Sequence, residues 1–477
     1  MKLESAAAVV QPLTLRMKMS YGVGALGIAV IYGVLLQLLF YYYTDVYGLT
    51  PKEAGLVSFL ATLWDGIVDP IVAWITSQTK SRLGRYRPWL IFGAAPVTLA
   101  FVLVFMRPGW AAGELFLVAL CAQFLFRTLY QAVFLPYTAL VAQLTTVAAE
   151  RSVAASYKAW FVTFGQLVVA GGALTLVEKL GGADAQKGFL LTAVIVAAIS
   201  GICILQAGLF TREVETVGDA AVADEPHPAK VLGAVLRNRY AVMVAGAVLI
   251  FSLSTVIVPS GLIYIFQYDL GHRDDARLAL SSIYVAGLIA SPVWANLTRR
   301  FGKQLGWLGG CLTCGTMLVV AALAHPSSTP AFCAIFFVYG LGLQAIWVVM
   351  FASMADAVDY GEWRQGRRAE AMSFGVLTSI NKASLAMSGG LLGLMLTWIG
   401  FRPNHVQSPE TLHGLRLAIF LLPAFFWFAT AALMAFYRLS NRLHAEARAT
   451  LQQRRNSQGH AVASATQPLP ANGERAC

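Results

Sequence analysis

Two aspartates, Asp65 and Asp69, lie four residues apart in an otherwise apolar stretch of the sequence. In an α-helix this spacing places both carboxylates on the same face. Acids inside a membrane span are costly, so two in one span favour a functional site. Pro70 has no backbone N–H and leaves the carbonyl of Gly66 without its helical partner. Such oxygens suit a small hard cation, and solvated or ion-paired aspartates at a helix end are the structural alternative.

Two basic residues also stand deep in apolar stretches. Lys382 is too far from the ends of its stretch to reach the membrane surface easily. A buried lysine needs an acid nearby, so we expect Asp65 or Asp69 beside it, with the lysine acting as a tethered cation. Arg127 needs a partner as well. It either neutralises one of the two aspartates or receives an anionic part of a solute, and the sequence leaves both open.

The composition is that of a membrane protein with many spans. Of the 477 residues, 57% are hydrophobic and 12% are charged, which excludes an ordinary soluble domain. Twelve apolar runs are long enough to cross a bilayer as helices. They cover roughly residues 22–43, 54–76, 88–106, 113–137, 155–177, 187–210, 240–267, 277–297, 305–324, 331–355, 371–398 and 414–437.

The basic residues indicate the orientation of the chain. A net charge of +11 can signal nucleic acid, but most Lys and Arg lie in the first segment, in loops after even-numbered runs and in the tail. This is the positive-inside pattern, so we expect cytoplasmic termini, contact with membrane lipid and no nucleic-acid partner. The first twenty residues lack an apolar region followed by a cleavage site, and we expect no removable signal peptide.

The chain divides into two similar halves of six runs each. Related basic loops at 82–85 and 299–303 follow the second and eighth runs, which indicates two related helix bundles. We expect a cytoplasmic segment at 1–20, a first bundle at 21–210, a connector at 211–239, a second bundle at 240–438 and a cytoplasmic, disordered tail at 439–477.

Basic residues follow the second run, and charged residues of both signs crowd the cytoplasmic end of the tenth run. Such groups can form ion pairs that hold one face of a two-bundle protein closed and separate when the halves move. A solvated loop is the alternative. The candidate gate residues are Arg85, Arg87, Asp356, Asp359, Glu362 and Arg367.

No arrangement typical of an enzyme is visible. The seven histidines lie in loops, at the ends of runs or in the tail, so they do not bring metal ligands or a catalytic base into one plane of the membrane. Cys311 and Cys314 have no second cysteine pair or nearby histidine, and small apolar filling explains them better than metal or redox chemistry. We therefore expect neither enzymatic activity nor a cofactor.

Several motifs occur together along the chain. They are YYYTDV at 41–46, WDGIVDP at 64–70, SRLGRYRPW at 81–89, ADAVDYGE at 355–362, GFRPNHVQS at 400–408, and the pair Thr378 and Lys382. In combination they resemble the glycoside–pentoside–hexuronide:cation symporters, the melibiose-permease branch of the major facilitator superfamily. The resemblance runs from about residue 21 to about residue 438.

The resemblance implies an all-α membrane protein with twelve helices in two six-helix bundles that expose a central site to each side in turn. It implies a cation site at Asp65 and Asp69, with Lys382 as the residue that couples cation to solute. Lys158 lies near the end of its run, and an extension to the membrane surface is its alternative role. The positions that the resemblance places around the sugar and cation sites are Tyr130, Lys158, Trp347 and Thr378.

Four positions depart from the melibiose-type pattern. Ala29 and Phe134 replace two acids that accept hydrogen bonds from sugar hydroxyls, Thr138 replaces a stacking tryptophan, and Gln131 replaces a cation-site threonine. A pocket that contains Phe134 and Arg127 is better suited to an anionic or more apolar solute than to a neutral polyol. The change to Gln131 leaves both Na⁺ and H⁺ open as the coupling ion.

We therefore expect a secondary transporter of the bacterial plasma membrane that couples symport of a sugar or glycoside-type solute, such as a uronate or modified glycoside, to Na⁺ or H⁺. A cation-coupled transporter of a lysolipid or of another amphipathic or anionic non-sugar solute is the alternative. We expect it to act as a monomer. Candidate cation ligands are Asp65, Asp69, Gly66 and Thr378, and candidate solute-binding residues are Arg127, Tyr130, Phe134, Lys158 and Trp347.

Overall fold

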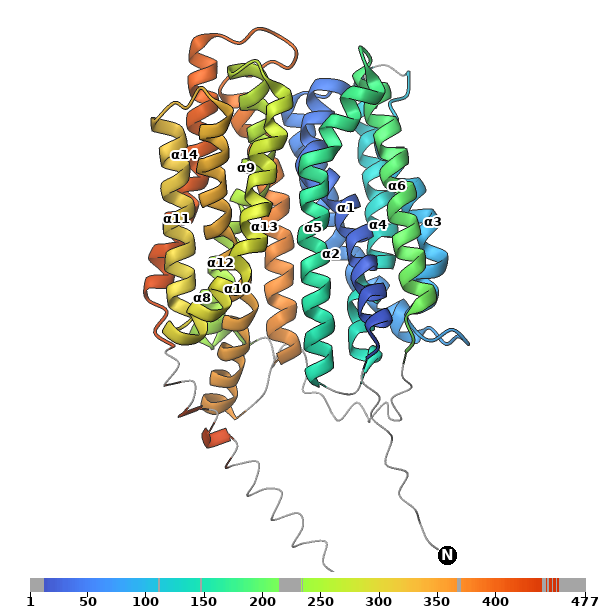
Figure 1. Cartoon of the computed structure of the whole chain (residues 1–477), viewed down its shortest axis with the longest axis vertical. Coiled ribbons are helices and arrows are strands. Elements are labelled where there is room, and N and C mark those ends of the chain that lie inside the picture. Colours follow the sequence, from blue (N-terminus) through green and yellow to red (C-terminus); the bar gives the residue numbers. More distant parts are fainter. Residues whose placement is uncertain are drawn as a thin grey trace, which may run out of the picture.

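The computed structural model consists of long helices that stand side by side in two bundles (Figure 1). It describes residues 13–109, 112–145, 148–213, 235–366 and 370–439, together with residue 233 and several positions between 443 and 453. Within these ranges no residue is in a β-strand. The gate candidate Arg367 and most of the predicted connector lie outside the described residues.

The first bundle packs α1 against α5 and α6, α2 against α4, and α3 against both α4 and α6. A π-helical turn, η1, extends α1 without a break. The bounds are α1 Leu15–Tyr41, η1 Tyr42–Tyr47, α2 Pro51–Gln78, α3 Arg87–Val104, α4 Ala112–Leu144, α5 Ala148–Gly181 and α6 Ala185–Phe210.

The second bundle packs α10 and α11 against α12, and α8 against α13 and α14. Its first span is built from three consecutive pieces, of which the last, η2, is again a π-helical turn. The bounds are α8 Arg239–Ser252, α9 Ser254–Tyr264, η2 Ile265–Asp269, the short 3₁₀ turn η3 Arg273–Asp275, α10 Ala276–Phe301, α11 Lys303–Leu323, α12 Thr329–Gln365, α13 Glu370–Trp398 and α14 Pro409–Ala435.

Twelve membrane-length helices are present in the described part of the chain. Eleven stretches are long and apolar enough to cross a membrane. The twelfth is α13, which has 29 residues and carries Lys382. The predicted all-α, twelve-helix arrangement is thereby confirmed.

Local capping decides where several helices begin. α1 starts at Leu15, earlier than the bundle boundary predicted at residue 21, because the Thr14 hydroxyl accepts a hydrogen bond from the Met17 N–H at 3.3 Å. α2 starts with a capping box, in which Thr50 and Glu53 each accept the other's backbone N–H. Most of the tail predicted at 439–477 lies outside the described residues, and the described positions between 446 and 453 are helical.

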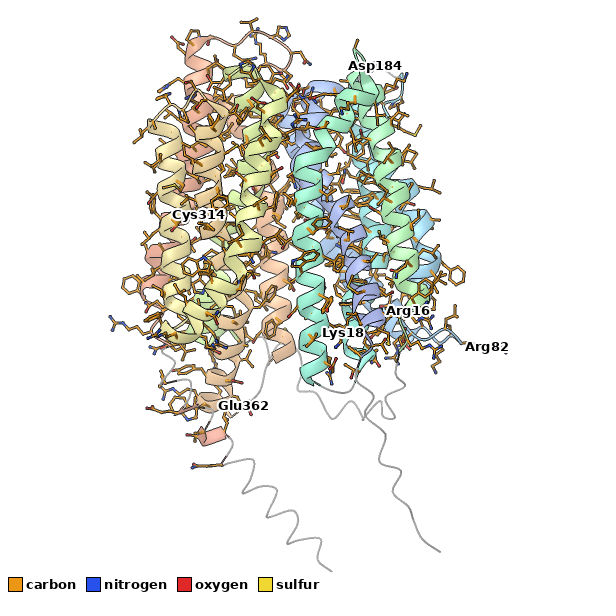
Figure 2. The ribbon with its side chains drawn as sticks, viewed as in Figure 1. Arg16, Lys18, Arg82, Asp184, Cys314 and Glu362 are labelled. Atoms are coloured by element: carbon orange, nitrogen blue, oxygen red, sulfur yellow. The ribbon has the colours of Figure 1, made fainter. Side chains whose placement is uncertain are left out.

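The two ends of the molecule differ in which segments they carry. Figure 2 shows Arg16, Lys18, Arg82 and Glu362 toward one end and Asp184 at the other. We call the end with Arg16 the terminal end, because α1 begins there and α14 ends there, and the opposite end the far end.

Glycines bring the two bundles into backbone contact. A Cβ added to Gly393 of α13 would lie 2.4 Å from the carbonyl oxygen of Pro51 in α2, and one added to Gly55 would lie 3.0 Å from the Gly393 Cα. A Cβ added to Gly171 of α5 would lie 3.0 Å from the side-chain Oγ of Ser281 in α10. In a membrane, small residues of this kind let helices pack closely where apolar burial supplies no driving force.

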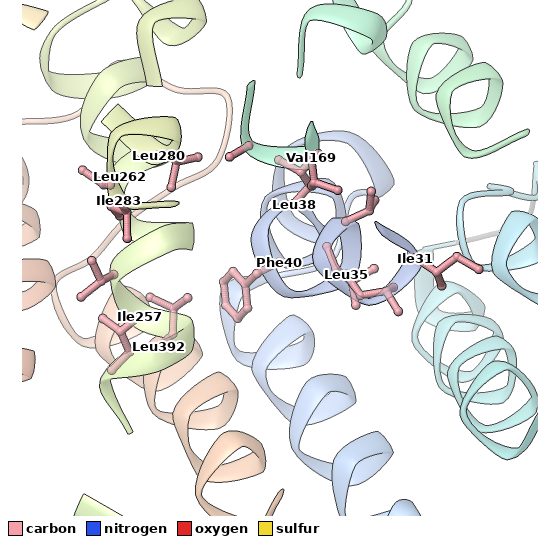
Figure 3. Close-up of a cluster of buried hydrophobic side chains, with 14 of the residues drawn as sticks. Ile31, Leu35, Leu38, Phe40, Val169, Ile257, Leu262, Leu280, Ile283 and Leu392 are labelled. Atoms are coloured by element: carbon pink, nitrogen blue, oxygen red, sulfur yellow. The ribbon is translucent and has the colours of Figure 1, made fainter. Parts of the chain in front are cut away.

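Buried apolar side chains fill the boundary between the bundles near these contacts (Figure 3). They come from helices that are far apart in the sequence, so this packing joins the halves of the chain. The side chains are Leu35, Leu38 and Phe40 of α1, Val169 of α5, Ile257 and Leu262 of α9, Ile283 of α10 and Leu392 of α13.

Candidate cation and solute site

A cavity of about 720 Å³ lies between the two bundles. Helices α1, α2, α4 and α5 line it from the first bundle, and α9, α10, α12 and α13 from the second. Most of its wall is apolar or aromatic, which is typical of a site for a small organic ligand. The charged and amide side chains that line it are Asp65, Gln131, Lys158, Gln166, Gln344, Asn381 and Lys382.

Asp65 is paired with Arg127 at the edge of this cavity. The Arg127 Nη1 donates to Asp65 Oδ2 at 2.6 Å, and both side chains are largely buried. Of the two roles that the sequence left open for Arg127, the structure shows the ion pair. The Arg127 Nε and the Asp65 Oδ1 are buried and have no hydrogen-bond partner in the described structure.

Asp69 is paired with Lys382, and this pair crosses the boundary between the bundles. The Lys382 Nζ donates to Asp69 Oδ2. Asp69 lies on α2 and Lys382 on α13, which pack against each other. The expectation that a deep lysine would find one of these two acids is correct, and the structure decides which one.

Three buried side-chain oxygens in this region accept no hydrogen bond from the described residues. They are Asp65 Oδ1, Asp69 Oδ1 and Gln131 Oε1. Unpaired buried oxygens are costly, and a hard cation or a proton would satisfy them. Gln131 stands one turn beyond Arg127 on α4, and it lines the cavity together with Asp65. The amide therefore supplies an oxygen where the related pattern has a threonine hydroxyl.

The other two cation-site candidates, Gly66 and Thr378, have no described contact with the two aspartate carboxylates. Pro70 lies inside α2, which continues without a break, so the Gly66 carbonyl lacks its helical donor as predicted. Gly66 itself is exposed. Thr378 stands one turn from Lys382, but its hydroxyl donates to the carbonyls of Phe374 and Gly375 in its own helix at 3.0 Å. No described contact joins Thr378 to either aspartate.

An aromatic wall faces the cavity on the side of α4. Tyr130 stacks on Phe134 with 5.5 Å between ring centroids, and Tyr32 of α1 stacks on Tyr130 at 5.7 Å. Lys158 of α5 extends over this wall, with its Nζ 6.0 Å from the Phe134 centroid and 5.5 Å from that of Tyr137. Lys158 thus lines the cavity and does not extend to the membrane surface.

Trp347 of α12 lines the opposite side of the cavity and is 38% exposed. Four of the five candidate solute-binding residues therefore line one cavity. The fifth, Arg127, is the partner of Asp65.

Amide and phenol groups that the sequence analysis did not select also line the cavity. Gln37 of α1 donates to Gln166 of α5 at 3.0 Å and to the Tyr284 hydroxyl of α10 at 3.2 Å. Gln166 and Tyr284 line the cavity, and the bond from Gln37 to Tyr284 links the two bundles there. The sequence signal for this network was the presence of glutamines inside apolar runs. A polar side chain deep in a membrane helix indicates that it lines a cavity or has a hydrogen-bond partner.

Comparison with known proteins identifies the family. Residues 20–441 match the family of MFS/sugar transport proteins. The chain belongs to this family. The transporter is therefore not an enzyme, as the sequence predicted.

Individual relatives agree over nearly the whole transporter. The putative glycoside/cation symporter YagG of Escherichia coli is 26% identical, with 95% of this chain and 98% of the relative covered. A putative 2,3-dihydroxypropane-1-sulfonate exporter of Salmonella typhimurium is 28% identical (91% and 95% covered), and a glucuronide carrier protein homologue of E. coli is 26% identical (96% and 99% covered). The predicted membership of the glycoside–pentoside–hexuronide:cation symporters is confirmed.

Solved structures show the same fold. A bacterial homologue of the human lysosomal transporter Spinster, in an inward-facing conformation, matches with a TM-score of 0.64 and 14% identity, over 90% of this chain and 98% of that chain. At this level of identity the likeness concerns the major facilitator fold alone.

Arg87 and Asp356, two of the candidate gate residues at the terminal end of the transporter, each contact a residue of their own bundle. The Arg87 Nε donates to the carbonyl of Gly208 at 2.9 Å. Glu213 accepts the backbone N–H groups of Arg85 and Arg87 at 2.7 and 2.9 Å and so caps the start of α3. Asp356 pairs with Lys303 of the same bundle, and the remaining described candidates, Asp359 and Glu362, follow it on α12.

A hydrogen-bonded cluster at the far end joins the two bundles. Tyr268 of η2 donates to Asp45 of η1, and the hydroxyls of Thr44 and Tyr264 lie 2.6 Å apart. Asn404 donates its backbone N–H to the Tyr268 hydroxyl at 2.9 Å and its side-chain amide to the Asp45 carbonyl at 2.8 Å. We call this set the far-end cluster. Thr44, Asp45 and Asn404 lie in two of the recognised motifs, to which the sequence analysis assigned no role, and Tyr264 and Tyr268 lie outside the motifs.

Proposed function

We propose that this protein is a symporter that couples uptake of a sugar or glycoside-type solute to Na⁺ or H⁺. The observation that carries the proposal is the group of unpartnered oxygens on Asp65, Asp69 and Gln131. This group of oxygens lies beside a cavity of suitable size for such a solute. Asp69, which carries one of these oxygens, pairs with Lys382 across the boundary between the bundles. Cation occupancy, solute occupancy and the contact between the bundles can therefore influence one another.

The terminal end faces the cytoplasm in this proposal. Arg16, Lys18 and Arg82 lie there (Figure 2), and an excess of basic residues marks the cytoplasmic side of a membrane protein. The relatives are bacterial proteins, which supports a place in the bacterial inner membrane with both termini inside. The cavity lies within one chain, so a monomer in contact with lipid suffices.

Coupling follows from competition for Asp69. A cation bound at the two carboxylates, or a proton on Asp69, weakens the attraction between Asp69 and Lys382. Because these residues lie on α2 and α13, weakening the pair loosens one link between the bundles. Solute contacts with both walls of the cavity then replace that link, and the loaded transporter changes the side to which the cavity opens.

An anionic non-sugar solute is the second candidate. A relative named as an exporter of 2,3-dihydroxypropane-1-sulfonate favours it, as do the basic side chains Lys158 and Lys382 that line the cavity. A lysolipid is a further amphipathic alternative, supported by the aromatic wall.

The proposal is tested with the purified full-length protein in proteoliposomes. Accumulation of methyl β-D-glucoside, methyl β-D-glucuronide, 2,3-dihydroxypropane-1-sulfonate and a lysolipid is measured under an imposed Na⁺ gradient or pH gradient. We expect one of the two gradients to drive accumulation of a sugar, and Asp69→Asn to abolish it while the protein still elutes as a folded species. Asp184→Asn is the matched control, because Asp184 caps α6 at the far end. Gradient-driven uptake that survives in Asp69→Asn would refute the assigned site.

A further inference from the structure

The charged groups around the cavity do not cancel. Asp65 is balanced by Arg127, and Asp69 is balanced by Lys382. Lys158 has no acidic partner among the described residues, and its Nζ lies over the rings of Phe134 and Tyr137. Two acids therefore face three bases, and the charges of these five side chains sum to +1.

This charge opposes the binding of a coupling cation on its own. Both carboxylates of the cation site are already neutralised by cations that are tethered to the chain. Adding Na⁺ or H⁺ raises the charge of the site from +1 to +2 inside a membrane, where like charges repel much more strongly than in water. A solute with one negative charge returns the site to +1, which is the summed charge of its own side chains.

The cavity also offers a place for that negative charge. Lys158 extends from α5 over the rings of Phe134 and Tyr137 and lines the cavity, as Asp65 does. The residues where a galactoside-reading pocket has acids are Ala29 and Phe134, and both line this cavity. Because no acidic side chain among the described residues pairs with Lys158, the N–H groups of its ammonium can donate hydrogen bonds to a ligand. The stacked rings of Tyr32, Tyr130 and Phe134 form a flat surface for the apolar face of a sugar or an aryl group.

We propose that the solute is a monoanion held by Lys158, and that its negative charge is required for the coupling cation to bind. The inference rests on the proposed cation coupling and adds to it the charge class of the solute. Solute and cation then move together with no net charge of their own, while the site keeps its charge of +1. A carboxylate and a sulfonate share the chemistry that Lys158 recognises.

Three 4-nitrophenyl glycosides that differ only at C6 distinguish these cases. They carry a hydroxymethyl group (β-D-glucoside), a carboxylate (β-D-glucuronide) or a sulfomethyl group (the sulfoquinovoside). Binding to the purified transporter is measured by calorimetry in a series of Na⁺ concentrations at fixed pH, and in a pH series without Na⁺. We expect at least one anionic glycoside to bind about tenfold more tightly when the coupling cation is present, and the neutral glycoside to show no such linkage.

Substitutions locate the effect. Lys158→Gln should reduce the affinity for the anionic glycoside about tenfold or more, and it should let the coupling cation bind more readily without an anion, because the charged side chains of the site then sum to zero. Lys179→Gln removes a charge from the same helix at an exposed position outside the cavity and is the control, which should behave as the wild type. Equal loss of neutral and anionic binding in Lys158→Gln would assign that residue a merely structural role and overturn the proposal.

Further outcomes separate this inference from the function on which it rests. If the neutral glycoside binds with the same cation linkage as the anions, the charge rule is wrong and cation coupling stands. If no glycoside responds to either cation, and Asp69→Asn changes nothing, the proposed coupling itself fails. If none of the three glycosides binds, the proposal that the solute is a sugar or glycoside and the proposal that it is an anionic sugar are both refuted.

Discussion

Loss of one hydroxyl in the far-end cluster should favour opening of that end. Tyr268→Phe removes the hydrogen bond to the buried carboxylate of Asp45 and leaves the ring contacts in place. Hydrogen bonds to charged groups contribute about 1.5–3 kcal/mol. Thr44 still donates to the Asp45 carboxylate, and Asn404 still donates to the Asp45 backbone carbonyl, so we expect the lower value. About 1.4 kcal/mol corresponds to a tenfold change in an equilibrium constant, and the far-open population should therefore rise about tenfold.

Distances between spin labels on the two bundles measure this population. Lys52 at the start of α2 and Arg402 in the loop before α14 are exposed at the far end and suit cysteine labelling in a background without the native cysteines. Tyr47→Phe is the control, because the Tyr47 hydroxyl is buried at the same end without a partner. An unchanged distance distribution in Tyr268→Phe, or an equal change in Tyr47→Phe, would show that the cluster does not hold the bundles together.

Two further predictions concern the ion pair and the helix contacts. Arg127→Ala leaves the Asp65 carboxylate buried without its cationic partner, which should lower the free energy of unfolding by about 3–5 kcal/mol. The double variant Arg127→Ala with Asp65→Asn should recover most of this loss in a thermal melt. If the double variant shows no recovery, the ion pair does not stabilise the fold. Gly393→Ala should sharply reduce the yield of folded protein because its Cβ would meet the Pro51 carbonyl, whereas Gly66→Ala, with nothing within 4 Å, should be tolerated. Equal behaviour of the two glycine variants in size-exclusion chromatography would contradict the packing argument.

Local features of the sequence were sufficient to predict the spans and part of the site. Long apolar runs can only be membrane helices, and helical geometry places Asp65 and Asp69 on one face whatever surrounds them. The depth of Lys382 in its run demanded an acid, because a lone charge is not stable there. These conclusions depend on residues close together in the chain and on the properties of the membrane.

Tertiary packing decided which groups meet. Lys382 and Asp69 are 313 positions apart in the sequence, and Tyr268 and Asp45 are 223 apart. The partner of Arg127, the position of Lys158 in the cavity and the far-end cluster all depend on how α1, α2 and α4 are placed against other helices. A side chain's type limits the partners that it can accept, but the choice among them depends on the distance between helices, which the contacts of the whole fold determine.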